Sequence, residues 1–216
     1  MELAKDYLDL GIYTDRYEAM RHFYVDEIGL PYEELLKAGR GVHQHRLSLN
    51  GAVLKLNSSR ESLIETPTNF RGFDIGTDTR ASGAFHDPDG TRVNLVSGGA
   101  VCVYWASSDP GRLADLLVSG LGATEQTRGL MSIGRTLLAL EPGGGPVGPL
   151  RSRGLRYLTV QVRDVRLEHQ RLITCGWTEQ SAPVRLGDTA FISFVSDPDG
   201  AMVEVSQRAS LTGPLP

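Results

Sequence analysis

One carboxylate, Glu204, lies in the middle of an apolar, strand-forming run. It stands between Val203 and Val205 in the segment Ala-Met-Val-Glu-Val-Ser-Gln, residues 201–207. Alternation along a strand places Glu204 on the face opposite to the two valines. Because an unpaired buried carboxylate is very costly, Glu204 is expected to face a cavity or a partner charge. In a cavity it is a candidate general acid or base.

The residues expected to share a cup with Glu204 are mostly apolar or aromatic. Alternation along their predicted strands places them on one face, and they are Cys102, Tyr104, Met131, Leu138, Leu140, Tyr157, Thr159, Gln161, Met202 and Ser206. This composition suits a small organic molecule, with Tyr157 as a second catalytic candidate because its hydroxyl could orient Glu204. Alternatively, Glu204 is a structural acceptor for hydrogen bonds from Tyr157 or Gln161. Cys102 has no histidine placed to activate it and is interpreted as a buried structural cysteine.

A second group of polar residues surrounds a predicted hairpin. Asn50-Gly51 between two alternating runs predicts a tight turn that places Arg46 opposite Lys55. Two like charges in this arrangement are destabilising unless an anion lies between them. Asp9, on the first predicted strand, is one candidate anion, and the three side chains would then form a structural ion pair. The alternative is an acidic substrate held by Arg46 and Lys55.

Periodicity predicts the elements that position these residues. Asp-Pro-Asp-Gly occurs at 87–90 and at 197–200, each time before an alternating strand, which indicates hairpins within a duplicated unit. The other expected strands are 7–14, 32–37, 42–49, 52–57, 70–77, 101–106, 124–128, 130–134, 136–141, 156–163 and 177–182, and the expected helices are 16–28, 110–119 and 165–174.

These elements form repeated βαβββ units. We therefore expect an N-terminal domain at 1–98, whose second unit is truncated, a C-terminal domain at 99–209, and a tail at 210–216.

Composition narrows the classes of function. The 216 residues carry a formal net charge of −4, which argues against sequence-independent nucleic-acid binding. No apolar run approaches the roughly 20 residues of a membrane helix, and the N-terminus lacks the apolar core of a secretion signal. Cys102 and Cys175 have neither disulfide-framework nor metal-type spacing. We expect a cytoplasmic monomer or homodimer whose partner is a small molecule, not a nucleic acid or a membrane.

Paired βαβββ units that end in Asp-Pro-Asp-Gly-x-x-Val-Glu, or a close variant, resemble the vicinal oxygen chelate superfamily. That group includes glyoxalase I, bleomycin-resistance proteins and extradiol dioxygenases. Residues 191–207 carry the most specific part of the resemblance, supported by His22-Phe23-Tyr24 and Ile28-Gly29-Leu30. The resemblance implies an α+β fold in which tandem paired modules form two cup-shaped mixed sheets with helices on their outer faces.

The resemblance also implies a divalent metal (Fe, Mn, Zn or Ni) on the floor of a cup. Its ligands would be a His on the first strand of a unit and a Glu or Gln on the last. These positions fall on Asp9, Lys55, Phe70, Asn94, Cys102, Leu138, Tyr157 and Glu204. Only Glu204 matches, so we predict no tightly held metal. His43 and His45 lie on the apolar face of their strand, where they are structural histidines, a His-x-His metal site or solvent-exposed residues.

Two functions follow from the resemblance. The first is an enzyme that acts on a small aromatic or carboxylate-bearing molecule by lyase, isomerase or ring-cleavage chemistry, with Glu204 as its key carboxylate. The second is a non-catalytic protein of the bleomycin-resistance type that sequesters such a molecule. The retained carboxylate favours the first function and the missing metal ligands favour the second.

Overall fold

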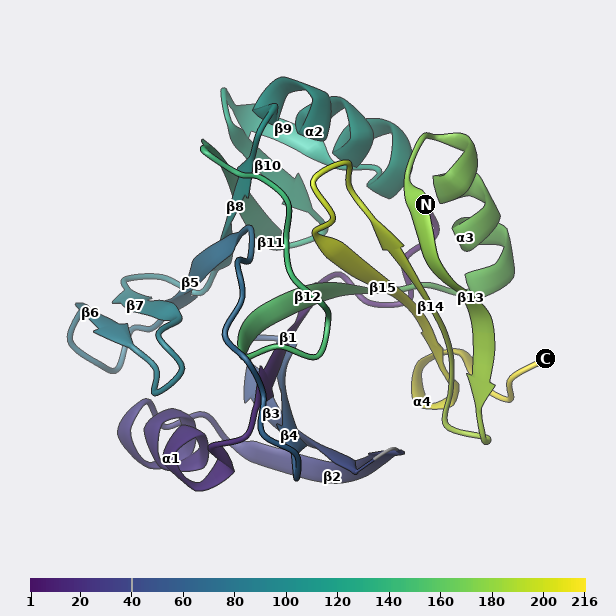
Figure 1. The fold of residues 1–216 in the computed structure, drawn as a ribbon. Coiled ribbons are helices and arrows are strands. Elements are labelled where there is room, and N and C mark those ends of the chain that lie inside the picture. Colours follow the sequence, from purple (N-terminus) through teal and green to yellow (C-terminus); the bar gives the residue numbers. More distant parts are fainter. Residues whose placement is uncertain (40) are drawn as a thin grey trace.

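Alternating apolar and polar residues form the strands of two curled, mixed sheets in the computed structural model, which describes residues 1–39 and 41–216 (Figure 1). The large sheet has the order β13 (Thr178–Leu186), β14 (Ala190–Ser196), β15 (Met202–Arg208), β12 (Gly154–Gln161), β1 (Asp9–Thr14), β4 (Ala52–Ser59), β3 (Val42–Leu49) and β2 (Tyr32–Gly39). The small sheet has the order β6 (Gly83–His86), β7 (Arg92–Val96), β5 (Phe70–Gly76), β8 (Val101–Ser107), β11 (Thr136–Pro142), β10 (Leu130–Ile133) and β9 (Thr124–Thr127). The predicted α+β fold of βαβββ modules in two cup-shaped sheets is confirmed.

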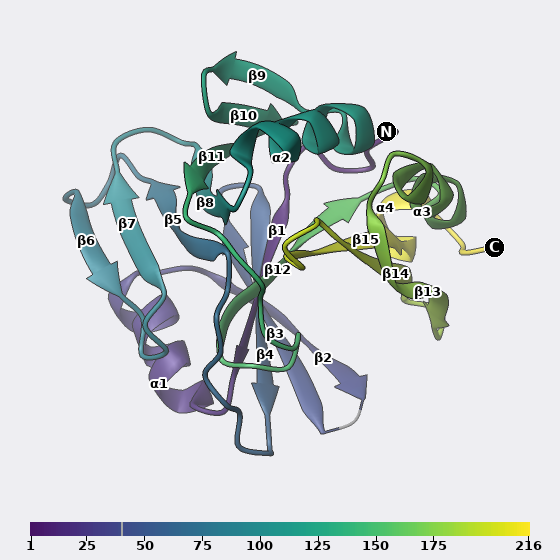
Figure 2. The same cartoon turned by 45° about the horizontal axis from the view of Figure 1, so that its top comes forward.

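The large sheet joins the first module of the chain to the last. Strand β1 pairs with β4 on one side and with β12 on the other. Strands β1 and β12 are the two middle strands of the sheet (Figures 1 and 2). The small sheet joins the two middle modules through β5 and β8. Residues 1–98 and 99–209 therefore each contribute strands to both sheets. Alternation predicts which residues share a face of a strand, but it does not predict which distant strands are neighbours.

Helices cover the sheets where the sequence predicts them. The helical segment α1 (Tyr17–Arg21) with η1 (His22–Glu27) packs on β4, whereas α2 (Pro110–Leu116), continued by η2 (Leu117–Leu121), packs on β8 and β11. Helix α3 (Val165–Thr174) packs on β13, β14 and β15, and the short α4 (Ala209–Thr212) begins the tail. Within the described residues no helix is long and apolar enough to cross a membrane.

Acidic residues begin two of these helices. The Asp109 side chain accepts a hydrogen bond from the backbone N–H of Arg112, and the next residue is a proline at the first helical position. The Asp164 side chain accepts from the backbone N–H groups of Arg166 and Leu167. Both caps satisfy helix donors that have no partner within the helix, which is why α2 and α3 start where they do.

Each Asp-Pro-Asp-Gly segment forms a turn that is tied to the core. The first aspartate of each accepts a backbone hydrogen bond across the turn, 2.8 Å from Thr91 to Asp87 and 2.7 Å from Ala201 to Asp197. The same carboxylates accept a hydrogen bond from a buried ring, that of Tyr24 for Asp87 and that of Trp105 for Asp197. The predicted duplication is thus visible in the hydrogen bonds of the two turns.

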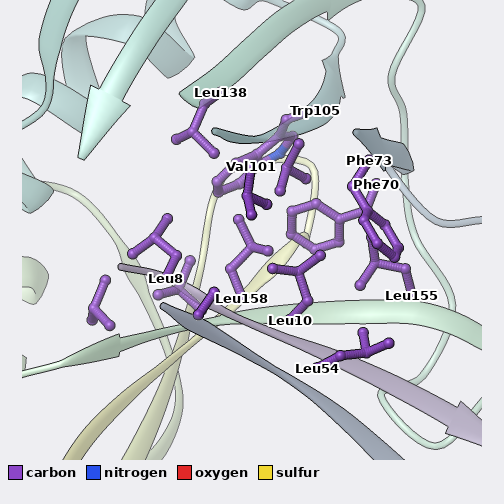
Figure 3. Packing of buried hydrophobic residues seen from close by; sticks show 14 of the residues in the cluster. Leu8, Leu10, Leu54, Phe70, Phe73, Val101, Trp105, Leu138, Leu155 and Leu158 are labelled. Atoms are coloured by element: carbon purple, nitrogen blue, oxygen red, sulfur yellow. The ribbon is translucent and has the colours of Figure 1, made fainter. Parts of the chain in front are cut away.

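The hydrophobic core lies between the two sheets. Figure 3 shows Leu8, Leu10, Leu54 and Leu158 of the large-sheet side packed toward Phe70, Phe73, Val101, Trp105 and Leu138 of the small-sheet side. Met131 and Leu138 are 1% and 0% exposed in this core, so their predicted place in a ligand cup is wrong. In the register of β10, β11 and β8, Leu138 pairs with Met131 and with Val103, and it is Leu137 that pairs with Cys102. The prediction was off by one residue on a short strand, which reverses the face.

Candidate functional site

Four neighbouring strands, β15, β12, β1 and β4, form the floor of the cup in the large sheet. Thr159 is paired with Asp9 on one side and with Glu204 on the other, while Gly11 is paired with both Lys55 and Tyr157. The sequence predicted two separate cups, one around Arg46 and Lys55 and one around Glu204. This prediction is wrong, because the pairing of β1 with β12 brings both groups into one cup.

A buried ion pair lies at the centre of this floor. The Nζ of Lys55 donates hydrogen bonds to Glu204 Oε2 at 3.0 Å and to Thr159 Oγ1 at 2.7 Å. The Thr159 hydroxyl in turn donates to the same Glu204 oxygen at 3.2 Å. Lys55 is 2% exposed and Glu204 is 6% exposed. Burial lowers the pKa of Lys55, and the charges of Glu204 and Asp9 offset part of this effect.

Asp9 is fully buried beside this pair and is held by other partners than predicted. Its Oδ1 accepts from Lys5 Nζ at 2.6 Å and from the backbone N–H of Val53 at 2.9 Å, and its Oδ2 accepts from Gln161 at 3.0 Å. Burial acts to raise the pKa of Asp9, but the charges of Lys55 and Lys5, together with these hydrogen bonds, lower it below its ordinary value. The charge of Asp9 thus acts on both Arg46 and Lys55, as predicted, but its direct ion pair is with Lys5.

Tyr157 lies on the floor with its hydroxyl turned toward Asn57. The Asn57 side-chain nitrogen donates to that hydroxyl at 3.1 Å, and the Lys55 ammonium lies 5.5 Å from the centre of the Tyr157 ring. Burial, and then the charge of Glu204, raise the pKa of Tyr157 well above its ordinary value. A side chain at Gly11 would overlap the Tyr157 ring, so only glycine fits there. The predicted hydrogen bonds from Tyr157 or Gln161 to Glu204 are replaced by those from Lys55 and Thr159.

Above this floor lies a cavity of about 570 Å³. Of the described residues that line it, four are cationic and one, Glu204, is a carboxylate. The cationic side chains are Lys37, Arg46, Lys55 and Arg208. The walls are apolar and aromatic, and they include Tyr13, Leu36, Tyr157, Leu186, Ile192 and Phe194. A cavity that combines apolar walls with an excess of cationic side chains favours a ligand with an apolar body and an anionic group.

The remaining predicted site residues lie at different depths or on the other sheet. Thr159 and Gln161 are buried in the floor, and Met202 is paired with Tyr157 on the same face. Cys102 and Tyr104 belong to β8 of the small sheet, so their predicted place beside Glu204 is wrong. There burial, and then the hydrogen bond that the Tyr104 hydroxyl donates to Asp74 at 2.7 Å, raise the pKa of Tyr104 to about 12. Burial raises the pKa of the Cys102 thiol to about 11, which makes it a poor nucleophile.

The donor set does not fit a divalent metal. Four of the predicted ligand positions lie in this cup, at Asp9, Lys55, Tyr157 and Glu204. Each of the two carboxylates already has an ammonium beside it, that of Lys5 for Asp9 and that of Lys55 for Glu204. A second cation would be repelled there. Among residues 1–39 and 41–216 no group of three or more His, Cys, Asp or Glu could hold a metal. His45 instead stacks on Tyr17, with their ring centres 3.9 Å apart, and its Nδ1 lies 3.1 Å from the Tyr32 hydroxyl oxygen.

Two mixed, curled sheets of βαβββ modules around such a cup are the vicinal oxygen chelate fold. Glyoxalase I from Zea mays has this fold with a TM-score of 0.75 and 14% identity, over 93% of this chain and 92% of that one. A Bacillus subtilis protein provisionally named a dioxygenase gives a TM-score of 0.69 and 13% identity, over 96% of this chain and 85% of that one. No protein-family model matches the sequence, and no curated protein matches it. The likeness establishes the fold.

Proposed function

We propose that the cup of the large sheet binds a small organic molecule with an aromatic or other apolar body and a carboxylate. We further propose that Lys55 and Glu204 transfer protons on it without a metal. The observation that carries this proposal is the Lys55–Glu204 contact of 3.0 Å on the floor of the 570 Å³ cavity. The cation excess accounts for the carboxylate of the ligand, and the aromatic walls account for its body.

The ion pair supplies both halves of acid–base chemistry. Burial lowers the pKa of Lys55, which brings its proton closer to release near neutral pH. The Lys55 ammonium can donate a proton to a ligand oxygen, while the Glu204 carboxylate can accept one from a neighbouring carbon. The reaction class that fits these roles is isomerisation through abstraction of a proton next to a carbonyl.

The same contact favours a second function, binding without catalysis. Lys55 and Glu204 already neutralise each other, and Thr159 completes their hydrogen bonds, so the pair also serves to hold the floor in place of a metal. In that case the cup sequesters its ligand unchanged. The two functions differ in whether a proton is exchanged on the bound molecule.

Glu204→Gln separates these functions, since it keeps the shape of the side chain and removes its charge. Phenylpyruvate, an aromatic 2-oxo acid, is the probe for proton transfer, followed by proton NMR as deuterium from the solvent enters its methylene group. The wild type should exchange faster than buffer alone, and Glu204→Gln should lose about 100-fold or more of that rate. Benzoate affinity, measured by calorimetry, should stay equal or rise, because a competing anion is gone. Glu125→Gln, an exposed change of equal charge on β9, is the control.

Unchanged exchange in Glu204→Gln would show that Glu204 is structural, whereas lower stability is expected in either case because Lys55 loses its buried partner. Benzoate that binds the wild type without any phenylpyruvate exchange would support the binding function instead. Benzoate should also bind about tenfold or more tightly than benzamide, its neutral analogue, since one charge-assisted contact is worth about that factor. Equal affinities would contradict the carboxylate preference.

A further inference from the structure

Two arginines meet in the wall of the cup at a single carboxylate. Arg46 belongs to β3 and Arg208 lies at the end of β15. These two strands lie on either side of the central strands β12, β1 and β4 of the large sheet. Arg208 Nη2 donates to Glu34 Oε1 at 3.1 Å, and Arg46 Nε lies 3.1 Å from the same oxygen. Glu34 belongs to β2, the edge strand of the sheet, and its side chain is 43% exposed. One oxygen of a half-exposed side chain thus lies beside two nearly buried guanidinium groups.

This arrangement leaves hydrogen-bonding capacity unused. The Nε atoms of Arg46 and Arg208 are both buried and make no hydrogen bond in the described part of the chain. Arg46 is 6% exposed, and among residues 1–39 and 41–216 its one other side-chain acceptor is Gln44, at a long 3.4 Å. A buried donor without a partner is costly, so sites of this kind are completed by a further acceptor.

The electrostatics favour an anion at the same place. Burial lowers the pKa of Arg46 and the nearby charge of Arg208 lowers it further, while the charges of Asp9, Glu34 and Glu33 offset only part of this effect. A planar guanidinium binds a carboxylate or a phosphate most strongly through two parallel hydrogen bonds, whereas Glu34 offers both arginines the same oxygen. An oxyanion with two or three oxygens free to turn would satisfy both groups.

The arginines are also accessible from the ligand cavity. Both line the 570 Å³ cavity, and both line a second cavity of about 260 Å³ that reaches Asp9 and Gln161 on the other side. They therefore stand in the wall that separates the two spaces. A ligand lying on the floor near Lys55 can place one end against this wall.

We infer that the space between Arg46 and Arg208 is an oxyanion subsite, which takes a carboxylate or phosphate group of the ligand in place of Glu34. The inference rests on the proposed function, since it names what holds the anionic end of the same ligand. Glu34 acts as an internal substitute for that group, and it can leave because it lies on an edge strand at the surface. Arg208 is a binding residue here, distinct from the Lys55–Glu204 pair.

The test uses calorimetric titrations of benzoate and of inorganic phosphate at fixed ionic strength. Glu34→Gln removes the internal competitor and should tighten binding about threefold or more. Arg208→Leu should weaken binding about tenfold or more. Arg208→Lys should give an affinity between those of the wild type and Arg208→Leu, because lysine keeps the charge but cannot form two parallel hydrogen bonds. Glu125→Gln and Arg128→Leu change the same charges at exposed positions and should have no effect. Circular dichroism confirms that each variant is folded.

A benzoate response without a phosphate response identifies a carboxylate, and the reverse identifies a phosphate. If Glu34→Gln and Arg208→Leu leave the affinities for both probes unchanged, or no probe binds even Glu34→Gln, the subsite is refuted. If phenylpyruvate exchange still depends on Glu204 in that case, the proposed function survives without the subsite. If exchange is absent but the Arg208 and Glu34 effects are seen, the subsite stands and the catalytic proposal fails.

Discussion

Lys55→Met is expected to lower the free energy of unfolding by about 3–5 kcal/mol. Methionine fills most of the volume of lysine, but the ammonium is lost from a site where it is 2% exposed and 3.0 Å from Glu204. Glu204 is then a buried charge without its partner, and breaking a buried pair from one side carries a cost of about this size. In a chain of 216 residues the loss corresponds to a melting temperature lower by roughly 6–20 °C.

The double variant Lys55→Met with Glu204→Gln shows whether the unpaired charge of Glu204 causes the loss of stability in Lys55→Met. It should recover part of the lost stability, since no unpaired carboxylate remains opposite residue 55. Lys37→Met, an exposed lysine at the rim of the same cavity, should melt like the wild type. A Lys55→Met protein that also melts within a degree of the wild type would show that the pair is solvated and of little energetic importance.

Asp9→Ala is the second change with a large expected effect, again about 3–5 kcal/mol at neutral pH. It removes the acceptor of three hydrogen bonds, from Lys5, Val53 and Gln161, and the second anion that faces Lys55. The pKa of Asp9 is lower in the folded state than its ordinary value. Its contribution is therefore present above the ordinary pKa of aspartate and is lost as the pH falls through the folded-state pKa.

Thermal melts of wild type and Asp9→Ala at several pH values measure this contribution. The difference between them should be full near pH 7 and should shrink as the solution becomes strongly acidic. Asp6→Ala, an exposed aspartate nearby in the chain, is the control and should change little. If Asp9→Ala melts like the wild type at pH 7, the lysine charges are solvated or are balanced by a bound anion.

Local patterns predicted the elements well because they depend on neighbouring residues. The helix predicted at 165–174 spans those residues, and the Asn50-Gly51 turn places Arg46 opposite Lys55 as expected. Glu204 faces the cup, as the valines on either side of it indicated. In each case the prediction depends on the periodicity of a strand or helix, or on the backbone conformation of a turn, and residues close together in the sequence determine both.

Long-range pairing could not be predicted, and the candidate site depends on it. The residues of β1 and of β12 do not indicate that these two strands pair with each other. Lys55 and Glu204, which are 149 residues apart, were therefore predicted to lie in different cups. Arg208 was missed, although it has the same parity as Glu204 on β15 and could have been found by extending the alternation. Glu34 gave no such signal, because it is a half-exposed acidic residue on an edge strand.

We propose that a lysine–carboxylate pair, and not a metal, forms the working floor of this cup. This claim is tested most directly by elemental analysis of dialysed wild-type protein together with benzoate titrations before and after treatment with a chelator. We predict less than a tenth of an equivalent of Fe, Mn, Zn or Ni and the same benzoate affinity in both titrations. About one retained equivalent of metal, or benzoate binding that is lost on chelation and restored by adding the metal, would contradict the claim.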